Sequence, residues 1–255
     1  MRGLACLFIA TLLCSTTAAQ VAVKHRQGSL HGFLALRSAE GELLAAGELV
    51  QTVHGDRVTV HLSFDFKDGS RYDETSVYTQ QRVFHLLSHH LVLKGPKFPN
   101  PLDLVTDVTK GNVTVKYSDK EKEQVKTEHM DMPPDLADGI LNTILQNVSA
   151  QAGETRLSMI VATPKPRLVK LAAASQGEDT FSIPGATRKG SHFVVKIELG
   201  GIAGAVAPLI GKEPHDIHIW ISTGEVPIFL RWQGPMYANG PSWVIEPTSP
   251  QLKEK

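Results

Sequence analysis

The ten residues 57–66, RVTVHLSFDF, indicate the class of fold. Apolar side chains occupy every second position from Val58 to Phe66, and polar side chains fill the positions between them. Alternation with a period of two is typical of a β-strand that buries one face and exposes the other. Because the pattern persists over the whole stretch, it predicts a long strand, and similar stretches recur on both sides.

Turn signals separate these strand-like stretches at short intervals. His54-Gly55-Asp56 and Lys67-Asp68-Gly69 are two of them, and Gly with Asp favours tight hairpin turns between antiparallel strands. The segment 174–190, ASQGEDTFSIPGATRKG, predicts a long surface loop or a hairpin tip. The other predicted strands span 30–38, 42–53, 70–79, 82–94, 102–109, 112–118, 123–130, 155–162, 166–174, 191–199, 216–222, 226–233 and 242–246.

One helix is expected within residues 133–150, PPDLADGILNTILQNVSA. Asp135 is placed to cap this helix, and Asp138 would lie in its first turn, where acidic residues are favourable. The apolar spacing predicts a helix that lies on the sheet with one face buried. That apolar stripe consists of Leu136, Ile140, Leu141, Ile144, Leu145 and Val148.

The uncharged segment 199–211, LGGIAGAVAPLIG, is the second element expected to cover the sheet. As a helix it would reach about 20 Å, against roughly 30 Å for a bilayer core, so we expect no membrane span here. Ile202, Val206 and Leu209 would share one stripe. The segment is either a short lid over the mouth of the sheet or a crossover packed on the core.

These elements predict a mainly β fold, a large curved antiparallel sheet or incomplete β-barrel with one amphipathic helix and a short apolar covering segment. This architecture resembles the incomplete-barrel carriers of bacterial periplasms, LolA and LolB, and the uncharacterised periplasmic proteins related to them. The resemblance spans about residues 30–246 and includes no shared motif, so no functional residue is carried over. It implies a concave apolar face that receives acyl chains.

The first nineteen residues, MRGLACLFIATLLCSTTAA, have the features of a secretory signal peptide. A single positive charge at Arg2 precedes an apolar core and a small-residue end, so cleavage is expected before Gln20. We therefore expect an exported protein, periplasmic or secreted. Both cysteines, Cys6 and Cys14, would be removed, and the mature chain would form no disulfide.

Charge and length limit the possible partners and the domain organisation. The chain has 26 basic and 26 acidic residues among 255, so nothing favours nucleic acid as a partner. Residues 20–248 are expected to form a single β-rich domain, and 249–255 a polar tail. The sequons at Asn112 and Asn147 are interpreted as chance occurrences.

Three histidines in the predicted strand 82–94 raise the question of a metal site. On a strand, His85 and His89 would lie on one face about 13 Å apart, too far to share an ion by themselves. The ligand spacings typical of zinc sites are missing from this segment, also when the third histidine, His90, is included. We therefore predict no metal and no cofactor.

The segment HDIHIW, residues 215–220, groups possible ligand-binding residues. In a strand, Asp216, His218 and Trp220 share one face, which is typical of a pocket wall or of a half-exposed sheet surface. The chain has two more tryptophans, Trp232 and Trp243, and we expect the three mainly in the core.

No hydrolase motif, metalloprotease motif or phosphate-binding loop was recognised, and no catalytic residue is predicted. The leading hypothesis is a non-enzymatic, soluble, exported binding or carrier-like protein that accepts an apolar or acylated ligand in the concave sheet. The alternative is a β-rich hydrolase of a glycan or similar cell-envelope substrate, with Asp216, His218 and Trp220 near its site. The predicted ligand-binding residues are Asp216, His218, Trp220, Ile202, Val206 and Leu209.

Overall fold

The computed structural model describes residues 20–120, 122–183, 186–198 and 214–249. The expected signal peptide, residues 1–19, and the expected covering segment, residues 199–211, lie outside the described residues. The expected roles of Ile202, Val206 and Leu209 in ligand binding therefore stay predictions.

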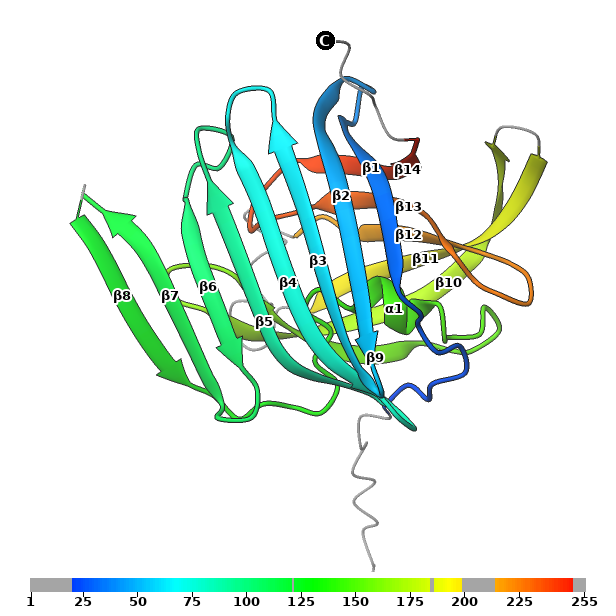
Figure 1. Cartoon of the computed structure of the whole chain (residues 1–255), viewed down its shortest axis with the longest axis horizontal. Helices are drawn as coiled ribbons and strands as arrows, with labels where there is room; N and C mark the ends of the chain where they lie inside the picture. Colours follow the sequence, from blue (N-terminus) through cyan, green and yellow to red (C-terminus); the bar gives the residue numbers. More distant parts are fainter. Residues whose placement is uncertain (1–19, 121, 184–185, 199–213, 250–255) are drawn as a thin grey trace, which may run out of the picture.

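Strands dominate the described residues, as the alternating patterns predicted (Figure 1). They are β1 (Leu30–Ser38), β2 (Leu43–His54), β3 (Arg57–Phe66), β4 (Arg71–Gln80), β5 (Phe84–Lys94), β6 (Leu102–Asp107), β7 (Asn112–Asp119), β8 (Lys122–His129), β9 (Thr155–Val161), β10 (Arg167–Ile183), β11 (Ala186–Glu198), β12 (Ile217–Ser222), β13 (Phe229–Pro235) and β14 (Ser242–Thr248). Residues 174–183 and 186–190 belong to the paired outer part of the β10–β11 hairpin, so the hairpin, the second of the two predicted forms, is confirmed for these residues.

All fourteen strands belong to one antiparallel sheet. Its order is β8-β7-β6-β5-β4-β3-β2-β1-β14-β13-β12-β11-β10-β9, so the first and last strands of the chain pair in its middle. Strands β8 and β9 end the order and do not pair with each other, which leaves the barrel open. The predicted class of fold, a large curved sheet or incomplete β-barrel, is confirmed.

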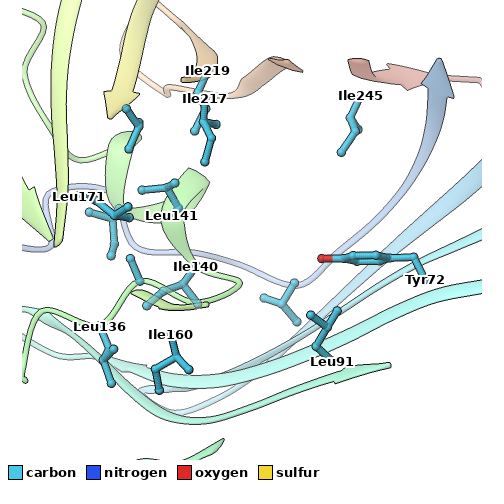
Figure 2. Close-up of a cluster of buried hydrophobic side chains, with 14 of the residues drawn as sticks. Tyr72, Leu91, Leu136, Ile140, Leu141, Ile160, Leu171, Ile217, Ile219 and Ile245 are labelled. Carbon is cyan, nitrogen blue, oxygen red and sulfur yellow. The ribbon is translucent and has the colours of Figure 1, made fainter. Parts of the chain in front are cut away.

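The sheet bends into two layers that enclose the hydrophobic core. Figure 1 shows β9–β14 crossing β1–β8 at a steep angle. The chain between β8 and β9 passes between these layers, and Figure 2 shows Ile140 and Leu141 among side chains of both, including Leu91 and Ile219. The apolar side chains of segment 136–145 thus fill part of the concave interior in which we expected a ligand.

The predicted helix is much shorter than expected. Only α1 (Leu141–Leu145) is helical, and its N-cap, Ile140, supplies no side-chain hydrogen bond. The predicted capping role of Asp135 is wrong, because this residue lies on the edge of β9 instead. The Ala137 amide donates to the Ser158 carbonyl oxygen at 2.9 Å, and the Ser158 amide donates to the Asp135 carbonyl oxygen at 3.0 Å.

This edge pairing explains why a helix does not begin at Asp135. The backbone groups of a first helical turn are used by β9, and Gly139 adopts a φ of +65°, which non-glycine residues rarely adopt. A Cβ at Gly139 would also overlap Ser76 Oγ. The predicted apolar stripe is nevertheless buried, apart from the partly buried Val148.

The two edge strands of the sheet are protected from further pairing in different ways. The edge of β9 is covered by Asp135–Ala137 through these main-chain bonds. The edge strand β8 is mostly exposed and carries Lys122, Glu123, Lys126 and Glu128. Charged side chains on an exposed edge discourage pairing with further strands.

Candidate functional site

A cleft of about 400 Å³ opens at one end of the barrel. It lies between the N-terminal segment that precedes β1, the chain that follows α1, and strands β10 to β12 with the turn after β12. Core residues Leu145, Phe193 and Ile221 lie beneath it and are at most 3 % exposed, whereas the partly buried Val148, Ala150 and Pro227 supply its apolar surface. Lys24, His25 and Glu178 line its rim. Most of the residues that line the cleft are polar, so it combines a small apolar surface with a polar, partly charged rim.

Asn147 fixes one side of this rim. Its side chain is 2 % exposed, and Oδ1 accepts hydrogen bonds from the backbone amides of Lys24, at 2.8 Å, and His25, at 2.7 Å. Its Nδ2 donates to the Thr143 carbonyl oxygen at 2.9 Å, which ties the N-terminal segment to α1. A buried amide that is bonded to the main chain is not an accessible glycan acceptor, in agreement with the interpretation of this sequon as chance.

The second candidate is a set of five side chains on the face of the β9–β14 layer away from the core, here named the outer group. His218 and Trp220 lie together on this face, as their spacing in the strand predicted. His192 of β11 stacks on Trp220, with ring centroids 4.4 Å apart, and its Nε2 lies 2.9 Å from His218 Nδ1. Trp220 Nε1 donates to Asp179 Oδ2 at 2.6 Å, and Arg231 lies over the indole, 5.5 Å from the ring centroid.

The side chains of the outer group bind one another. Burial lowers the pKa of His192, the nearby His218 lowers it further, and Asp179, 3.7 Å away, acts in the opposite direction. None of the five carries a hydroxyl or thiol nucleophile. Asp216 precedes β12 and takes no part in these contacts, so the structure brings together two of the three residues predicted here.

The sequence analysis did not identify His192 and Asp179 as site residues. His192 pairs with Trp220 across two strands, and Asp179 reaches the indole from β10 after a register shift between Ser175 and Glu178. Neither the register of two strands nor a bulge is visible in the spacing of a single strand.

The third candidate is a set of buried titratable residues between the layers, here named the interior group: Glu74, His89 and Asp138. His89 Nε2 lies 2.9 Å from Glu74 Oε1, with side chains 5 % and 15 % exposed. Asp138 Oδ1 accepts the Ile160 amide at 2.9 Å, and Asp138 Oδ2 has no hydrogen-bond partner among the described residues. Glu74 and His89 belong to the first layer and Ile160 to the second, so the group lies where the layers meet.

Burial acts on the pKa of two members of the interior group, Asp138 and His89. It raises the pKa of Asp138 to about 6, although the positive charge of His89 acts in the opposite direction. Burial also lowers the pKa of His89, but the hydrogen bond and charge of Glu74, with the charge of Asp138, outweigh it and leave the pKa raised. The predicted place of Asp138 in a first helical turn is wrong, because its carboxylate binds the edge of β9 instead.

The prediction that His85 and His89 share a face is also wrong. A bulge breaks the alternation, since Val77 pairs with Ser88 but Tyr78 pairs with Leu86. His89 therefore points inward, whereas His85 is half-buried beside inward-facing Leu86. Over the described parts of the chain, no group of three or more His, Cys, Asp or Glu residues is arranged to hold a metal ion.

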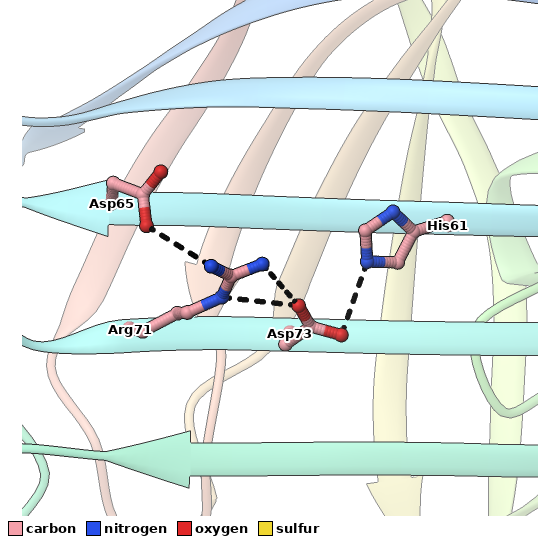
Figure 3. Close-up of polar contacts among 4 residues, drawn as sticks. All are labelled: His61, Asp65, Arg71 and Asp73. Atoms are coloured by element: carbon pink, nitrogen blue, oxygen red, sulfur yellow. Dashed lines mark hydrogen bonds and ion pairs between the residues drawn. The ribbon is translucent and has the colours of Figure 1, made fainter.

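The acidic hairpin of β3 and β4 carries an exposed ion network (Figure 3). Arg71 Nη2 lies 2.7 Å from Asp73 Oδ2, His61 Nε2 lies 3.1 Å from Asp73 Oδ1, and Asp65 lies near the same guanidinium. The turn itself has Gly69 at a φ of +82°, as its sequence predicted. Exposed pairs of this kind contribute little free energy, so the network is ordinary surface structure.

No helix of the described residues is long and apolar enough to cross a membrane. No protein-family model matches the chain, and no curated protein matches it. Among solved structures, the chain is similar to the crystal structure of a β-barrel-like protein of the domain of unknown function DUF1849 from Brucella abortus. The match has a TM-score of 0.47 and 10 % identity, and it covers 90 % of this chain and 99 % of that chain. At this identity and score, no residue or activity is transferred from it.

Proposed function

We propose that this protein is an exported, non-enzymatic binding or carrier protein that holds an apolar or acylated ligand in the cleft at the end of the barrel. The observation that supports this most directly is a cleft in which a small apolar surface adjoins a charged rim. Methylene groups of the ligand would lie against Val148, Ala150 and Pro227, and a polar head would stay at the rim in contact with water.

The size of the cleft agrees with this use. A volume of about 400 Å³ lies within the range of small-molecule sites, which are typically a few hundred cubic ångströms. Each methylene group that a ligand buries contributes about 0.8 kcal/mol, so an acyl chain gains affinity in proportion to the length that the apolar residues cover. The outer group is a weaker candidate for ligand binding, because its side chains are already paired with one another.

The test is to fill the cleft from its rim. Ala150 lines the cleft and is half-buried, so Ala150→Trp would occupy the space without entering the core. The delipidated protein is titrated with a fluorescent fatty acid, and the variant is expected to lose at least about tenfold in affinity, since a single indole can displace several methylene contacts.

The control places the same residue elsewhere. Ala39 is exposed in the turn between β1 and β2 and does not line the cleft, so Ala39→Trp should bind as the wild type does. Equal binding by the two variants would place any ligand outside the cleft, and no saturable binding by the folded wild-type protein would remove the proposed function.

Export is the second part of this proposal, and it is carried by the sequence of residues 1–19. The mature protein should begin at Gln20 and appear in the osmotic-shock fraction of a bacterial host. The intact mass of the protein in that fraction checks this expectation. A mass that still includes residues 1–19 would contradict it.

A further inference from the structure

The edge strand β8 offers backbone hydrogen-bonding groups along its outer side. It ends the order of the sheet, and no strand of the described residues pairs with that side (Figure 1). The Met130 amide donates to the Gly111 carbonyl oxygen at 2.8 Å, and bonded and non-bonded pairs alternate along an antiparallel ladder. Because the register of β7 and β8 is unbroken, the even-numbered residues of β8 bond to β7. The backbone groups of Glu123, Val125 and Thr127 therefore point outward in the plane of the sheet.

The charged side chains of β8 lie in a definite order on one face. Val115 is fully buried and pairs with Lys126, so the even-numbered side chains of β8 stand on the face of the sheet that carries the core. Along this face the strand reads Lys122, Gln124, Lys126 and Glu128. It is thus positive at its start and negative at its end.

A second copy of β8 in antiparallel orientation complements this order. When Val125 lies opposite Val125 of the second copy, Lys122 lies opposite Glu128 at both ends of the pairing, and Gln124 lies opposite Lys126. These even-numbered residues would form the pairs without main-chain bonds, in which side chains approach most closely and opposite charges are favourable. The odd-numbered residues would supply the main-chain bonds between the two copies.

The same charges disfavour the neighbouring registers. Main-chain bonding between two copies requires odd-numbered residues to face odd-numbered residues, so the pairing can shift only by two positions. A shift in one direction puts Lys126 opposite Lys126, and a shift in the other puts Lys122 opposite Lys126. Like charges directly opposite each other are destabilising. Charges that discourage pairing of this edge with strands of other sequence thus leave one register open to a second copy.

We infer that two copies of this chain associate edge to edge through β8, antiparallel about a two-fold axis at Val125, so that their sheets become continuous. A two-fold interface uses the same surface on both copies, as this register does. Val125 is 56 % exposed, so it is accessible to a second copy. Only one strand from each copy takes part, so the interface is small and the dimer should form in a concentration-dependent way.

The first experiment tests the association and its charges by sedimentation equilibrium over a range of protein concentrations. Lys122→Glu puts two glutamates opposite each other at both ends of the pairing and should weaken the dimer at least about tenfold. Lys122→Glu combined with Glu128→Lys reverses both charges and should restore most of the association. Lys67→Glu makes the same charge change in the exposed turn between β3 and β4, and should behave as the wild type.

The second experiment tests the register by disulfide cross-linking in a chain with Cys6 and Cys14 replaced by serine. Val125→Cys should give a linked dimer under mild oxidation, because bonded antiparallel pairs place their Cα atoms about 5.5 Å apart, within disulfide range. Glu123→Cys alone should not cross-link, since the two cysteines would lie four residues apart along the strands, about 13 Å. Glu123→Cys mixed with Thr127→Cys should cross-link, because these positions face each other.

Each outcome decides a part of the inference. A wild type that stays monomeric at every concentration would overturn the association. A dimer that Lys122→Glu leaves unchanged, or that the double variant does not restore, would contradict the role of the charges. Cross-linking by Glu123→Cys alone, with none by Val125→Cys, would rule out the two-fold axis at Val125. Circular dichroism checks that the variants, all changed at exposed or half-buried positions of an edge strand, keep the fold.

Discussion

The interior group and the outer group contain hydrogen bonds of the same length in very different surroundings. His89 lies 2.9 Å from Glu74, and His192 lies 2.9 Å from His218. The interior pair is 5 % and 15 % exposed, whereas His192 is 20 % exposed and His218 is half-buried. The distance alone therefore does not tell how much each contact contributes to stability, because water screens the contact in the outer group and barely reaches the one in the interior group.

This difference in exposure indicates which titratable residues contribute most to the stability of the fold. The interior group lies between the two layers, so losing one member leaves a buried polar atom without a partner. The outer group joins neighbouring strands of one layer, and His192 and Asp179, which are 20 % and 55 % exposed, can turn to water when a partner is lost. We expect the interior group to contribute more to stability.

The largest effect is expected from removing His89. His89→Ala leaves Glu74 buried without its partner and opens a cavity, which should lower the free energy of unfolding by about 3 kcal/mol. The neighbouring His90→Ala removes a pair of the same length with Asp103, but both side chains are more than one third exposed. That control should cost less than about 1 kcal/mol. Urea denaturation of both variants checks this, and equal losses would contradict the comparison.

A smaller effect concerns Asp138 and depends on pH. Its pKa rises from 3.8 to about 6 on folding, so within this range the folded state keeps a proton that the unfolded state has lost. The free energy of unfolding should therefore fall as pH rises through this window. Asp138→Asn, which can still accept the Ile160 amide, should remove this fall and exceed the wild type by up to about 2 kcal/mol near the upper end.

Denaturation curves at several pH values between about 4 and 6 test this expectation. Asp131→Asn, at an exposed position, should keep the wild-type pH dependence. An unchanged slope in Asp138→Asn would mean that this carboxylate does not titrate in the folded protein as its burial requires.

The smallest effect belongs to the outer group. Trp220→Phe loses the hydrogen bond to Asp179 but keeps an aromatic ring against His192, so it should cost about 1 kcal/mol. Trp232→Phe is the matched control, because Trp232 Nε1 has no hydrogen-bond partner among the described residues. Thermal unfolding should show a larger loss for Trp220→Phe, and a loss as large as that of His89→Ala would break the ranking of the two groups.

Local patterns predicted most of the fold because strands and tight turns depend on neighbouring residues. The alternation in residues 57–66 and the turn at Gly69 both appear as expected. The length of the helix within residues 133–150 was overestimated. Its apolar spacing correctly predicted which side chains are buried but not the backbone conformation. Long-range bonds from Asp135 and Asp138 to β9, together with Gly139, override the helical spacing.

The candidate site was only partly predictable for the same reason. Alternation placed His218 and Trp220 on one face, but their partners His192 and Asp179 depend on strand register. Lys24 and Phe193 line the same cleft although most of the chain separates them in the sequence, and no local sequence pattern predicts that they come together. Of the three tryptophans, Trp243 and Trp232 pack in or against the core as expected, whereas Trp220 lies on the other face.

The pairing of β1 with β14 has a consequence for the order of folding. Twelve of the thirteen neighbouring pairs in the sheet join strands that are consecutive in the chain, and each can form as a local hairpin. Only β1 and β14 must meet across about two hundred residues, as Leu36 and Ile245 do. Bringing distant segments together is slow because chain entropy is lost before contacts form. Two hairpin series should therefore form early, and the pairing of β14 with β1 then joins them into one sheet.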